Sequence, residues 1–325
     1  MNRNKCLLII NPVSGTASKV KRDVPVRAVS RLYKAGIDLE IRYTEGPGHG
    51  KELARRAADN GYLGVIAAGG DGTVNEIAQA LVGTRTALGI IPLGSGNGLA
   101  RHIGLSLDVS EALNVIASRN ITPCDCCTAN GRYFFCTFGL GFDAAVSEKF
   151  STLKGRGLLN YLRSALLEYL KYTPREYEIV CNGHTQRIKA FIVSACNASQ
   201  YGNNAFIAPA ASIRDGLVDI TVVHAGSPFT RAFFGVDLLT GTVKNKLLVQ
   251  TFRAKELLIR RLTPGKSAHL DGEPVEMENE VEVKCCPGQL LMFTKEDKKP
   301  FRPLLTPMLY MHRELWSRVG RLFGR

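Results

Sequence analysis

A glycine-rich stretch at residues 64–80, GVIAAGGDGTVNEIAQA, holds the residue types that bind phosphate groups. Residues 64–68 are small or apolar and predict a short buried strand, which ends at Gly69 and Gly70. From Thr73 onward, apolar residues at helical spacing predict a helix. A glycine turn between a strand and a helix lets the backbone approach an anion, and the free N–H groups at the helix start point at it. The stretch therefore predicts a phosphate-binding turn.

Asp71 adds a carboxylate to this turn, where a phosphate-bound Mg²⁺ could be held. The turn lacks the Gly-Lys-Ser/Thr of a Walker loop, and its glycine spacing is not that of the dinucleotide fingerprint. An alternative interpretation is a capping box, in which Thr73 and Glu76 serve only to start the helix.

A second glycine turn follows about one strand–helix unit later. Residues 87–91, ALGII, predict another buried strand, and Gly94-Ser95-Gly96-Asn97 follows it. Two such turns at neighbouring strand ends can face one ligand from both sides. A further turn, Asn11-Pro12-Val13-Ser14-Gly15, comes after the first predicted strand.

The elements that must position these turns alternate between strand and helix, which predicts a parallel, doubly wound sheet. In such sheets ligands bind at the carboxyl ends of the strands, where the glycine turns and Thr44 fall. The predicted strands cover residues 6–10, 38–43, 64–68 and 87–91, and the predicted helices cover residues 19–35, 50–60 and the segment from 73.

Near Pro123 the pattern changes to the alternation of antiparallel strands, and Asn182-Gly183 is a strong hairpin signal. We therefore predict an α/β domain at residues 1–123, completed by 295–325, and a β-rich domain at 124–294, with a cleft between them. The predicted strands are 133–138, 176–181, 187–195, 217–223, 256–260, 281–284 and 289–294, and the predicted helices are 158–172 and 227–240.

Composition limits the classes of protein. The 325 residues suffice for two domains, and no apolar run is long enough to span a bilayer. Nine cysteines, scattered and mostly in apolar segments, are typical of a reduced cytosol. The C-x-x-C at residues 124–127 and the pair Cys285-Cys286 could suggest zinc, but neighbouring residues on a strand point to opposite faces, which makes the ligand geometry awkward.

The net charge of +13 is compatible with nucleic acid, an anionic membrane or a polyphosphate ligand as partner. Basic residues dominate residues 298–325, and residues 308–325 have the pattern of a basic amphipathic helix on an anionic membrane. The alternative is a terminal helix docked on the first domain.

The GGDGT-x-N-E block at residues 69–76, with the G-S-G-N block at 94–97, resembles the diacylglycerol kinase/sphingosine kinase family of lipid kinases, which is related more distantly to NAD kinases. The resemblance implies an NAD kinase/diacylglycerol kinase-like α/β domain, a C-terminal antiparallel β-sandwich, and ATP and Mg²⁺ as cofactors. The nucleotide-binding residues that it implies are Asn11, Pro12, Ser14, Gly15, Thr44, Gly69, Gly70, Asp71, Gly72, Thr73, Asn75, Gly94, Ser95, Gly96 and Asn97.

Glu273 is the candidate for the base that phosphoryl transfer needs. By itself, Asp271-Gly272 reads as a turn between strands, and Glu273 as a solvated turn carboxylate. The D-G-E segment is similar to that of the family, in which the glutamate takes the proton of the lipid hydroxyl; Asp71 would organise Mg²⁺, and Asp271 would assist in position or shape.

The resemblance also implies a structural Mg²⁺ held by Asp215 and main-chain oxygens near Ser212 and Leu217, where the residues alone indicate a hairpin turn. Gly139-Leu140-Gly141-Phe142-Asp143 resembles the family's lipid-site segment. Asp143 could reach a polar lipid head or serve in a turn.

The acceptor stays open, because Gly98 stands where bacterial diacylglycerol kinases usually carry an aspartate. We expect an ATP- and Mg²⁺-dependent lipid kinase acting on a lipid alcohol such as diacylglycerol; the alternatives are a sphingoid-base or ceramide-type kinase and a kinase of a soluble substrate in the manner of NAD kinase. A third class, a non-catalytic regulator or nucleic-acid binder, is supported by no recognition motif in the sequence. We expect a cytoplasmic, peripherally membrane-associated protein with no nucleic-acid partner; a homodimer is left open.

Overall fold

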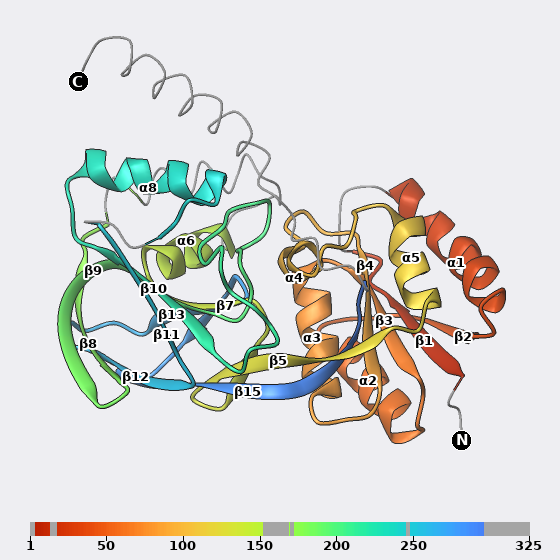
Figure 1. The fold of residues 1–325 in the computed structure, drawn as a ribbon. Coiled ribbons are helices and arrows are strands. Elements are labelled where there is room, and N and C mark those ends of the chain that lie inside the picture. The colour runs from red at the N-terminus through yellow and green to blue at the C-terminus, as the bar shows by residue number, and fades with distance from the viewer. Residues whose placement is uncertain (1–3, 14–17, 152–168, 170–171, 245–247, 296–325) are drawn as a thin grey trace, which may run out of the picture.

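The computed structural model describes residues 4–13, 18–151, 169, 172–244 and 248–295, and it divides into an α/β half and a β-rich half (Figure 1). The α/β half alternates strands and helices, as the sequence predicts. Its elements are β1 (Lys5–Ile10), α1 (Ser18–Tyr33), β2 (Asp38–Tyr43), α2 (His49–Asp59), β3 (Gly64–Gly69), α3 (Asp71–Leu81), β4 (Ala87–Pro92), α4 (Gly98–His102) and α5 (Val109–Ala117).

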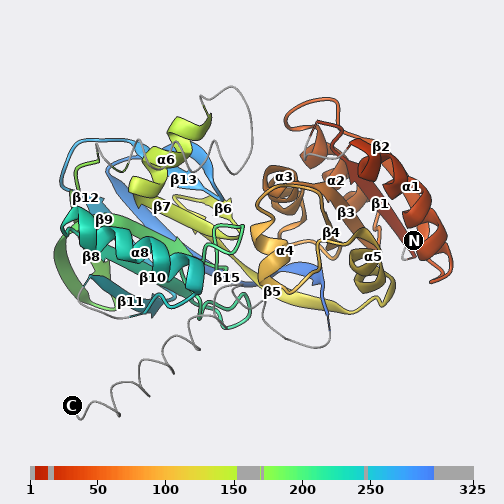
Figure 2. The same cartoon turned by 90° about the horizontal axis from the view of Figure 1, so that it is seen from above.

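The strands of this half form a parallel sheet in the order β2-β1-β3-β4. Strand β1 pairs with β2 on one side and with β3 on the other, so the chain winds in opposite directions from this point. Figure 2 shows α2 and α3 on one face of the sheet and α1 and α5 on the other. Because β1, β3 and β4 run parallel and in register, the turns that follow them meet at one edge.

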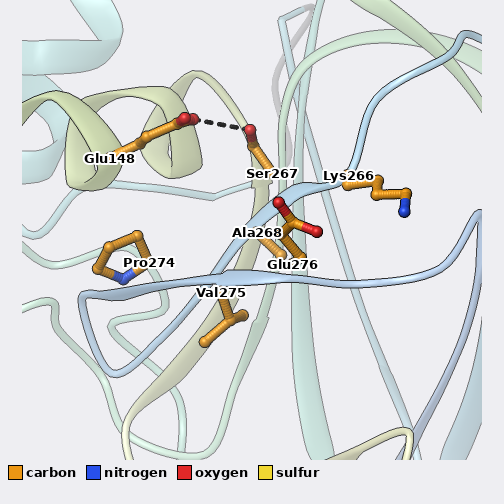
Figure 3. Close-up of a pocket in the computed structure, with 7 residues that line it drawn as sticks. All are labelled: Glu148, Lys266, Ser267, Ala268, Pro274, Val275 and Glu276. Carbon is orange, nitrogen blue, oxygen red and sulfur yellow. Dashed lines mark hydrogen bonds between the residues drawn. The ribbon is translucent and has the colours of Figure 1, made fainter.

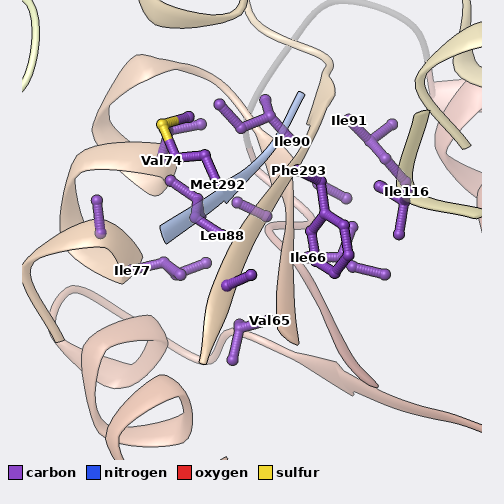
Figure 4. Packing of buried hydrophobic residues seen from close by; sticks show 14 of the residues in the cluster. Val65, Ile66, Val74, Ile77, Leu88, Ile90, Ile91, Ile116, Met292 and Phe293 are labelled. Atoms are coloured by element: carbon purple, nitrogen blue, oxygen red, sulfur yellow. The ribbon is translucent and has the colours of Figure 1, made fainter. Parts of the chain in front are cut away.

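The core of this half is formed by strands that are buried on both faces. Every residue of β3 and β4 is buried, as expected for a parallel sheet covered by helices. Figure 4 shows Met292 on the side of Val74 and Leu88, and Phe293 on the side of Ile66.

The β-rich half is a set of mostly antiparallel strands ordered β14-β13-β7-β9-β8-β12-β15, with β10 and β11 branching from β9. Its elements are β5 (Ile121–Ala129), β6 (Arg132–Phe134), β7 (Thr137–Gly141), α6 (Phe142–Ser151), β8 (Arg175–Cys181), β9 (His184–Cys196), β10 (Val218–His224), α8 (Pro228–Thr240), β11 (Val249–Ala254), β12 (Glu256–Arg261), β13 (Ser267–Leu270), β14 (Glu273–Glu276) and β15 (Glu280–Phe293).

Two long strands join the halves. Strands β5 and β15 pair antiparallel and run from one half into the other (Figure 1). At the far end of β15, Met292 pairs in parallel with Leu88 of β4, so β15 also extends the first sheet. The α/β half with a C-terminal β-sandwich confirms the predicted fold class, whereas the domain boundary itself stays a prediction.

The structure corrects three local predictions. The strand predicted at 133–138 is divided into β6 and β7, and the two strands predicted at 281–284 and 289–294 are one strand, β15. Its register shifts between Cys286 and Leu290, where β5 continues to pair beyond the irregularity. Strand β11 was missed.

Two further predictions concern helices. The helix predicted at 227–240 is confirmed as α8, whereas the segments 158–168, 170–171 and 308–325 lie outside the described residues. In the part of the chain that the structure describes, no helix is long and apolar enough to cross a membrane.

Candidate active site

The first glycine turn connects β3 to α3 without a side-chain cap. Gly70 is the N-cap residue in extended conformation, so the capping box predicted as an alternative is wrong. Glu76 instead accepts a hydrogen bond from the Lys51 amide through Oε1 (3.4 Å). The Thr73 hydroxyl folds back over the strand end and accepts from the Asn11 side chain (3.0 Å). The turn after β1 is thereby tied to the start of α3.

The two glycine turns are in van der Waals contact. A Cβ atom added to Gly94 would lie 2.5 Å from the Gly70 Cα, and one added to Gly70 would lie 3.2 Å from the Gly94 Cα. The Leu93 amide also donates to the Gly69 carbonyl (2.9 Å). Because backbone meets backbone here, only glycine fits at position 94 without displacing the other turn.

Asp71 holds the second turn against the first. Its Oδ2 accepts from the amide of Asn97 (2.8 Å), and its Oδ1 accepts from the amide of Gly98 (2.6 Å), at the start of α4. Burial raises the pKa of the Asp71 carboxyl, and the two amide donors act against this shift. Sequence reasoning missed this partner, because the two positions belong to different turns.

Asn97 closes the second turn from inside. It has a left-handed backbone (φ 52°), its Oδ1 accepts from the Gly94 amide (3.0 Å), and its Nδ2 donates to the Gly94 carbonyl (2.8 Å). Arg101 Nε donates to the Gly96 carbonyl (3.0 Å). These bonds make the loop a fixed frame.

The β-rich half contributes a hairpin turn to the same region. Leu270 of β13 pairs with Glu273 of β14, which leaves Asp271 and Gly272 as a two-residue turn with positive φ at both positions (51° and 85°). This is the backbone of the type I′ turn that an Asp-Gly pair favours.

The Asp271 carboxylate accepts four hydrogen bonds. Three come from the amides of Phe135 (2.9 Å), Cys136 (2.7 Å) and Thr137 (2.9 Å), and one comes from the side chain of Asn75 on α3 (2.7 Å). Because these amides turn toward Asp271, the chain leaves the sheet between β6 and β7, which explains the strand break. Burial raises the pKa of Asp271, and the four N–H donors act against this shift.

Glu273 is exposed and lies over the first turn of α3. Its Oε1 is 3.4 Å from the position that a Cβ on Gly72 would take. A carboxylate from the β-rich half therefore stands beside the glycine turn of the α/β half, 201 positions earlier in sequence (273 against 72).

Three other residues predicted for the phosphate site lie at the carboxyl-end edge of the parallel sheet. Thr44 is buried, and its amide donates to the Ile10 carbonyl (3.0 Å), which places it at the end of β1. Pro12 is exposed, and Ser95 lies within the loop that Asn97 closes. Ser14 and Gly15 lie outside the described residues.

The predicted metal residues lie elsewhere, in the turn before β10. Asp215 Oδ1 accepts from the Leu217 amide (3.2 Å), and its Oδ2 is 3.8 Å from Arg253. The Ser212 hydroxyl accepts from the Arg214 amide (3.3 Å). The donors on offer are oxygens, which Mg²⁺ prefers, but Arg253 already balances part of the Asp215 charge.

Asp125 supports this turn and was missed by sequence reasoning. Its two oxygens accept from the amides of Gly216 and Gly288 (2.8 Å each).

The cysteines of β5 and β15 lie opposite one another, Cys126 against Cys286 and Cys127 against Cys285, and all are free. Among the described residues, no group of three or more histidine, cysteine, aspartate or glutamate side chains is arranged to hold a metal ion.

A pocket of about 360 Å³ adjoins the hairpin that carries Glu273 (Figure 3). It lies between α6 and the β13–β14 hairpin, and the Ser267 hydroxyl donates to Glu148 across it (2.7 Å). Its lining residues are Glu148, Lys266, Ser267, Ala268, Pro274, Val275 and Glu276.

Known proteins match both halves of the chain. Residues 5–129 match the diacylglycerol kinase catalytic domain, and residues 137–294 match the YegS C-terminal NAD kinase beta sandwich-like domain. A "Probable lipid kinase YegS-like" protein of Chromohalobacter salexigens is 31% identical over 299 residues, covering 89% of this chain and 93% of the relative. A protein of Mycobacterium tuberculosis named diacylglycerol kinase is 29% identical over 279 residues, covering 83% of this chain and 88% of the relative.

Solved structures share the fold. A crystal structure of a diacylglycerol kinase from Bacillus anthracis has a TM-score of 0.71 at 23% identity, covering 90% of this chain and 97% of that chain. Another structure from this organism has a TM-score of 0.75 at 23% identity, covering 91% and 98%.

Fold and matched domains define the class, which is that of phosphotransferases of the lipid kinase type. Within this class, the chain belongs to the family of YegS-like lipid kinases that carry a diacylglycerol kinase catalytic domain.

Proposed function

We propose that this chain transfers the γ-phosphate of ATP to a hydroxyl of a lipid such as diacylglycerol, with the help of Mg²⁺. One observation supports this most directly: Glu273 Oε1 lies 3.4 Å from the Cβ position of Gly72, so a carboxylate faces the glycine turn. A phosphate held by the turn and a hydroxyl beside Glu273 would then be neighbours.

The glycine turns would hold the phosphates. The N–H groups of the first turn of α3 have no carbonyl partner within their own helix, and they point out of its N-terminus together with the positive end of the helix dipole. The contact of Gly70 with Gly94 makes the two turns one continuous backbone surface. Asn11 and Thr73, joined at 3.0 Å, would border this surface on the side of β1.

Glu273 would be the general base. As the lipid hydroxyl oxygen attacks phosphorus, its proton passes to the Glu273 carboxylate, a new O–P bond forms, and ADP leaves with the electrons of the bond that breaks. Mg²⁺ would supply charge neutralisation on the phosphates. Asp71 would organise this ion through the remaining lone pairs of its carboxylate, because each of its two oxygens already accepts one amide hydrogen bond.

A second, structural Mg²⁺ at Ser212, Asp215 and Leu217 stays part of the proposal. The oxygen donors fit this ion in kind. Its role would be to fix the turn that Asp125 also holds through the Gly216 amide (2.8 Å).

A sphingoid-base or ceramide-type acceptor is the second candidate, because Gly98 lacks the carboxylate that bacterial diacylglycerol kinases usually carry at this position. The structure places Gly98 against the carbonyl oxygens of Gln200 and Tyr201, each 3.4 Å from a Cβ built on Gly98. An aspartate at position 98 would have its side chain beside these two carbonyl oxygens, which accept but do not donate hydrogen bonds and would therefore disfavour a negative charge.

A lipid panel with labelled ATP tests the proposal. Purified full-length chain is incubated with diacylglycerol, a sphingoid base and ceramide in separate mixed micelles, each with Mg²⁺ and with a chelator in parallel. Label in the organic phase that disappears with the chelator supports the proposal, and the micelle that gives it names the acceptor. Label confined to the aqueous phase with a soluble hydroxyl acceptor, or no transfer to any lipid, overturns it.

A further inference from the structure

A buried polar cluster lies beneath the hairpin turn that carries Glu273. It consists of His269 on β13, Asp143 at the start of α6 and Tyr201 in the loop after β9. His269 is 1% exposed and Asp143 is 8% exposed. Buried polar groups destabilise a fold unless they are hydrogen-bonded. The hydrogen bonds of these three side chains therefore indicate the role of the cluster.

The cluster reaches the hairpin turn through His269. The Gly272 amide donates to His269 Nδ1 (3.3 Å), so this nitrogen accepts and carries no proton. In the neutral ring the proton is then on Nε2, which donates to Asp143 Oδ2 (3.1 Å). The Tyr201 hydroxyl donates to the same oxygen (2.9 Å). A continuous chain of bonds thus runs from the turn into the interior.

The hydrogen bond between His269 and Asp143 requires a glycine at position 139. Strand β7 pairs with β13 so that Gly139 lies opposite His269. A Cβ on Gly139 would be 2.1 Å from Asp143 Oδ2 and 2.2 Å from His269 Nε2. Any side chain at position 139 would separate the two groups. This glycine therefore serves the contact between His269 and Asp143.

The bonds of Asp143 leave it turned inward. Oδ2 takes the donors of His269 and Tyr201, and Oδ1 accepts from the Ala144 amide (2.9 Å). The sequence allows Asp143 a contact with a lipid head or a place in a turn. Its hydrogen bonds in the structure instead favour another role, which is to orient the imidazole of His269. An aspartate that fixes the tautomer and direction of a histidine is a familiar arrangement.

We propose that His269, oriented by Asp143 and Tyr201, is a positioning residue that sets the place of Glu273. The inference rests on the proposed role of Glu273 as base. Glu273 is exposed and follows directly on a two-residue turn, which is held by Asp271 on one side and by the Gly272–His269 bond on the other. A base displaced by about 1 Å can lose roughly 100-fold in rate, so the second contact matters for catalysis.

Four variants test this, with kcat, the KM for lipid, the KM for ATP and the melting temperature measured for each. H269A should lower kcat about 10- to 100-fold with the KM for lipid and ATP unchanged. H269N keeps an acceptor near the place of Nδ1 and should recover part of the lost kcat. D143N should lower kcat in the same way, and the matched control H184A, on an exposed histidine of β9, should behave as wild type.

The outcomes separate the alternatives. A D143N enzyme with unchanged kcat and a raised KM for lipid would show a head-group contact and overturn the inference. So would a kcat per folded protein that stays at the wild-type value in H269A, whatever the melting temperature. E273Q, assayed in parallel, tests the proposed role of Glu273 as the base. If E273Q keeps wild-type activity, that role is wrong. An inactive E273Q beside a fully active H269A would contradict only the inference about His269.

Discussion

The Asn75 side chain on α3 donates a 2.7 Å hydrogen bond to Asp271 in the β13–β14 turn, and this bond joins residues 196 positions apart. Asn75 belongs to the glycine-rich block, and Asp271 belongs to the D-G-E segment. The two sequence motifs of the candidate site are therefore in direct contact. This contact ties the turn that precedes the proposed base to the helix that follows the proposed phosphate turn.

Replacing Asn75 should weaken that contact in a charge-dependent way. N75A removes one donor to a carboxylate, a bond worth about 1.5–3 kcal/mol. N75D removes the donor and sets a second carboxylate against Asp271, so it should lower the free energy of unfolding more than N75A does. Urea titration of the two variants checks this. Equal losses would show that the Asp271 charge does not meet position 75.

The contact between the two glycine turns predicts that a side chain at position 94 lowers both ATP binding and stability. G94A would place a Cβ 2.5 Å from the Gly70 Cα, where neither backbone can yield without moving its turn. We expect at least about a tenfold higher KM for ATP and a loss of roughly 1–3 kcal/mol in stability. The matched control is G46A, because nothing lies within 4 Å of a Cβ at Gly46. Wild-type kinetics in G94A would contradict the assignment of the two turns to one ligand.

His102 should give the fold a pH dependence. Burial and the charge of Arg214 lower the pKa of His102 to about 4 from 6.5. The Ser199 amide donates to its Nδ1 (3.1 Å), which links α4 to the loop after β9. The unfolded chain takes up a proton near pH 6.5 while the folded protein does not, so this stability is complete above pH 6.5 and is lost as the pH falls from 6.5 to about 4.

The loss should approach roughly 3 kcal/mol. Unfolding free energies of wild type and H102N, measured between pH 7.5 and 4, check it, because the asparagine keeps an acceptor but does not titrate. The difference between the two proteins should change across this window. A constant difference would show that His102 is protonated alike in both states.

The packing of β15 into the first core can be tested at Gly64. A Cβ on Gly64 would lie 2.5 Å from the Phe293 ring and 2.9 Å from the Ala87 carbonyl oxygen. G64A should therefore cost about 1–3 kcal/mol, and adding F293L should restore part of it by removing the ring. Thermal unfolding of the single and double variants measures this. No recovery would assign the strain to the backbone contact instead.

Much of the fold could be predicted from local sequence patterns. Strands β1 to β4 and helices α2 and α3 were predictable within a residue or two because their apolar periodicity is strong and glycine or proline marks their ends. The Asn182-Gly183 hairpin between β8 and β9 was predictable for the same reason, since its type of turn needs positive φ (50° and 78°).

Long-range contacts could not be predicted in this way. The break between β6 and β7 comes from Asp271, which is more than a hundred positions away. The bonds of Asp71 to the second turn, and of His269 to Asp143, likewise join distant segments. A short motif shows which residue types are present, but it does not show which distant group will meet them. The capping box at Thr73 failed because α3 begins at Asp71, after the N-cap residue Gly70, which places Thr73 inside the helix; its hydroxyl accepts from the distant Asn11 side chain instead.

The central claim is that the Glu273 carboxylate acts on a hydroxyl beside the glycine turn, and one comparison tests it most directly. Phosphate transfer to lipid in a single turnover is measured for E273Q and for E278Q, which changes an exposed glutamate of the segment after β14. We predict a loss of roughly 100-fold or more in E273Q, with unchanged nucleotide affinity and a wild-type rate in E278Q. A wild-type rate in E273Q would contradict it.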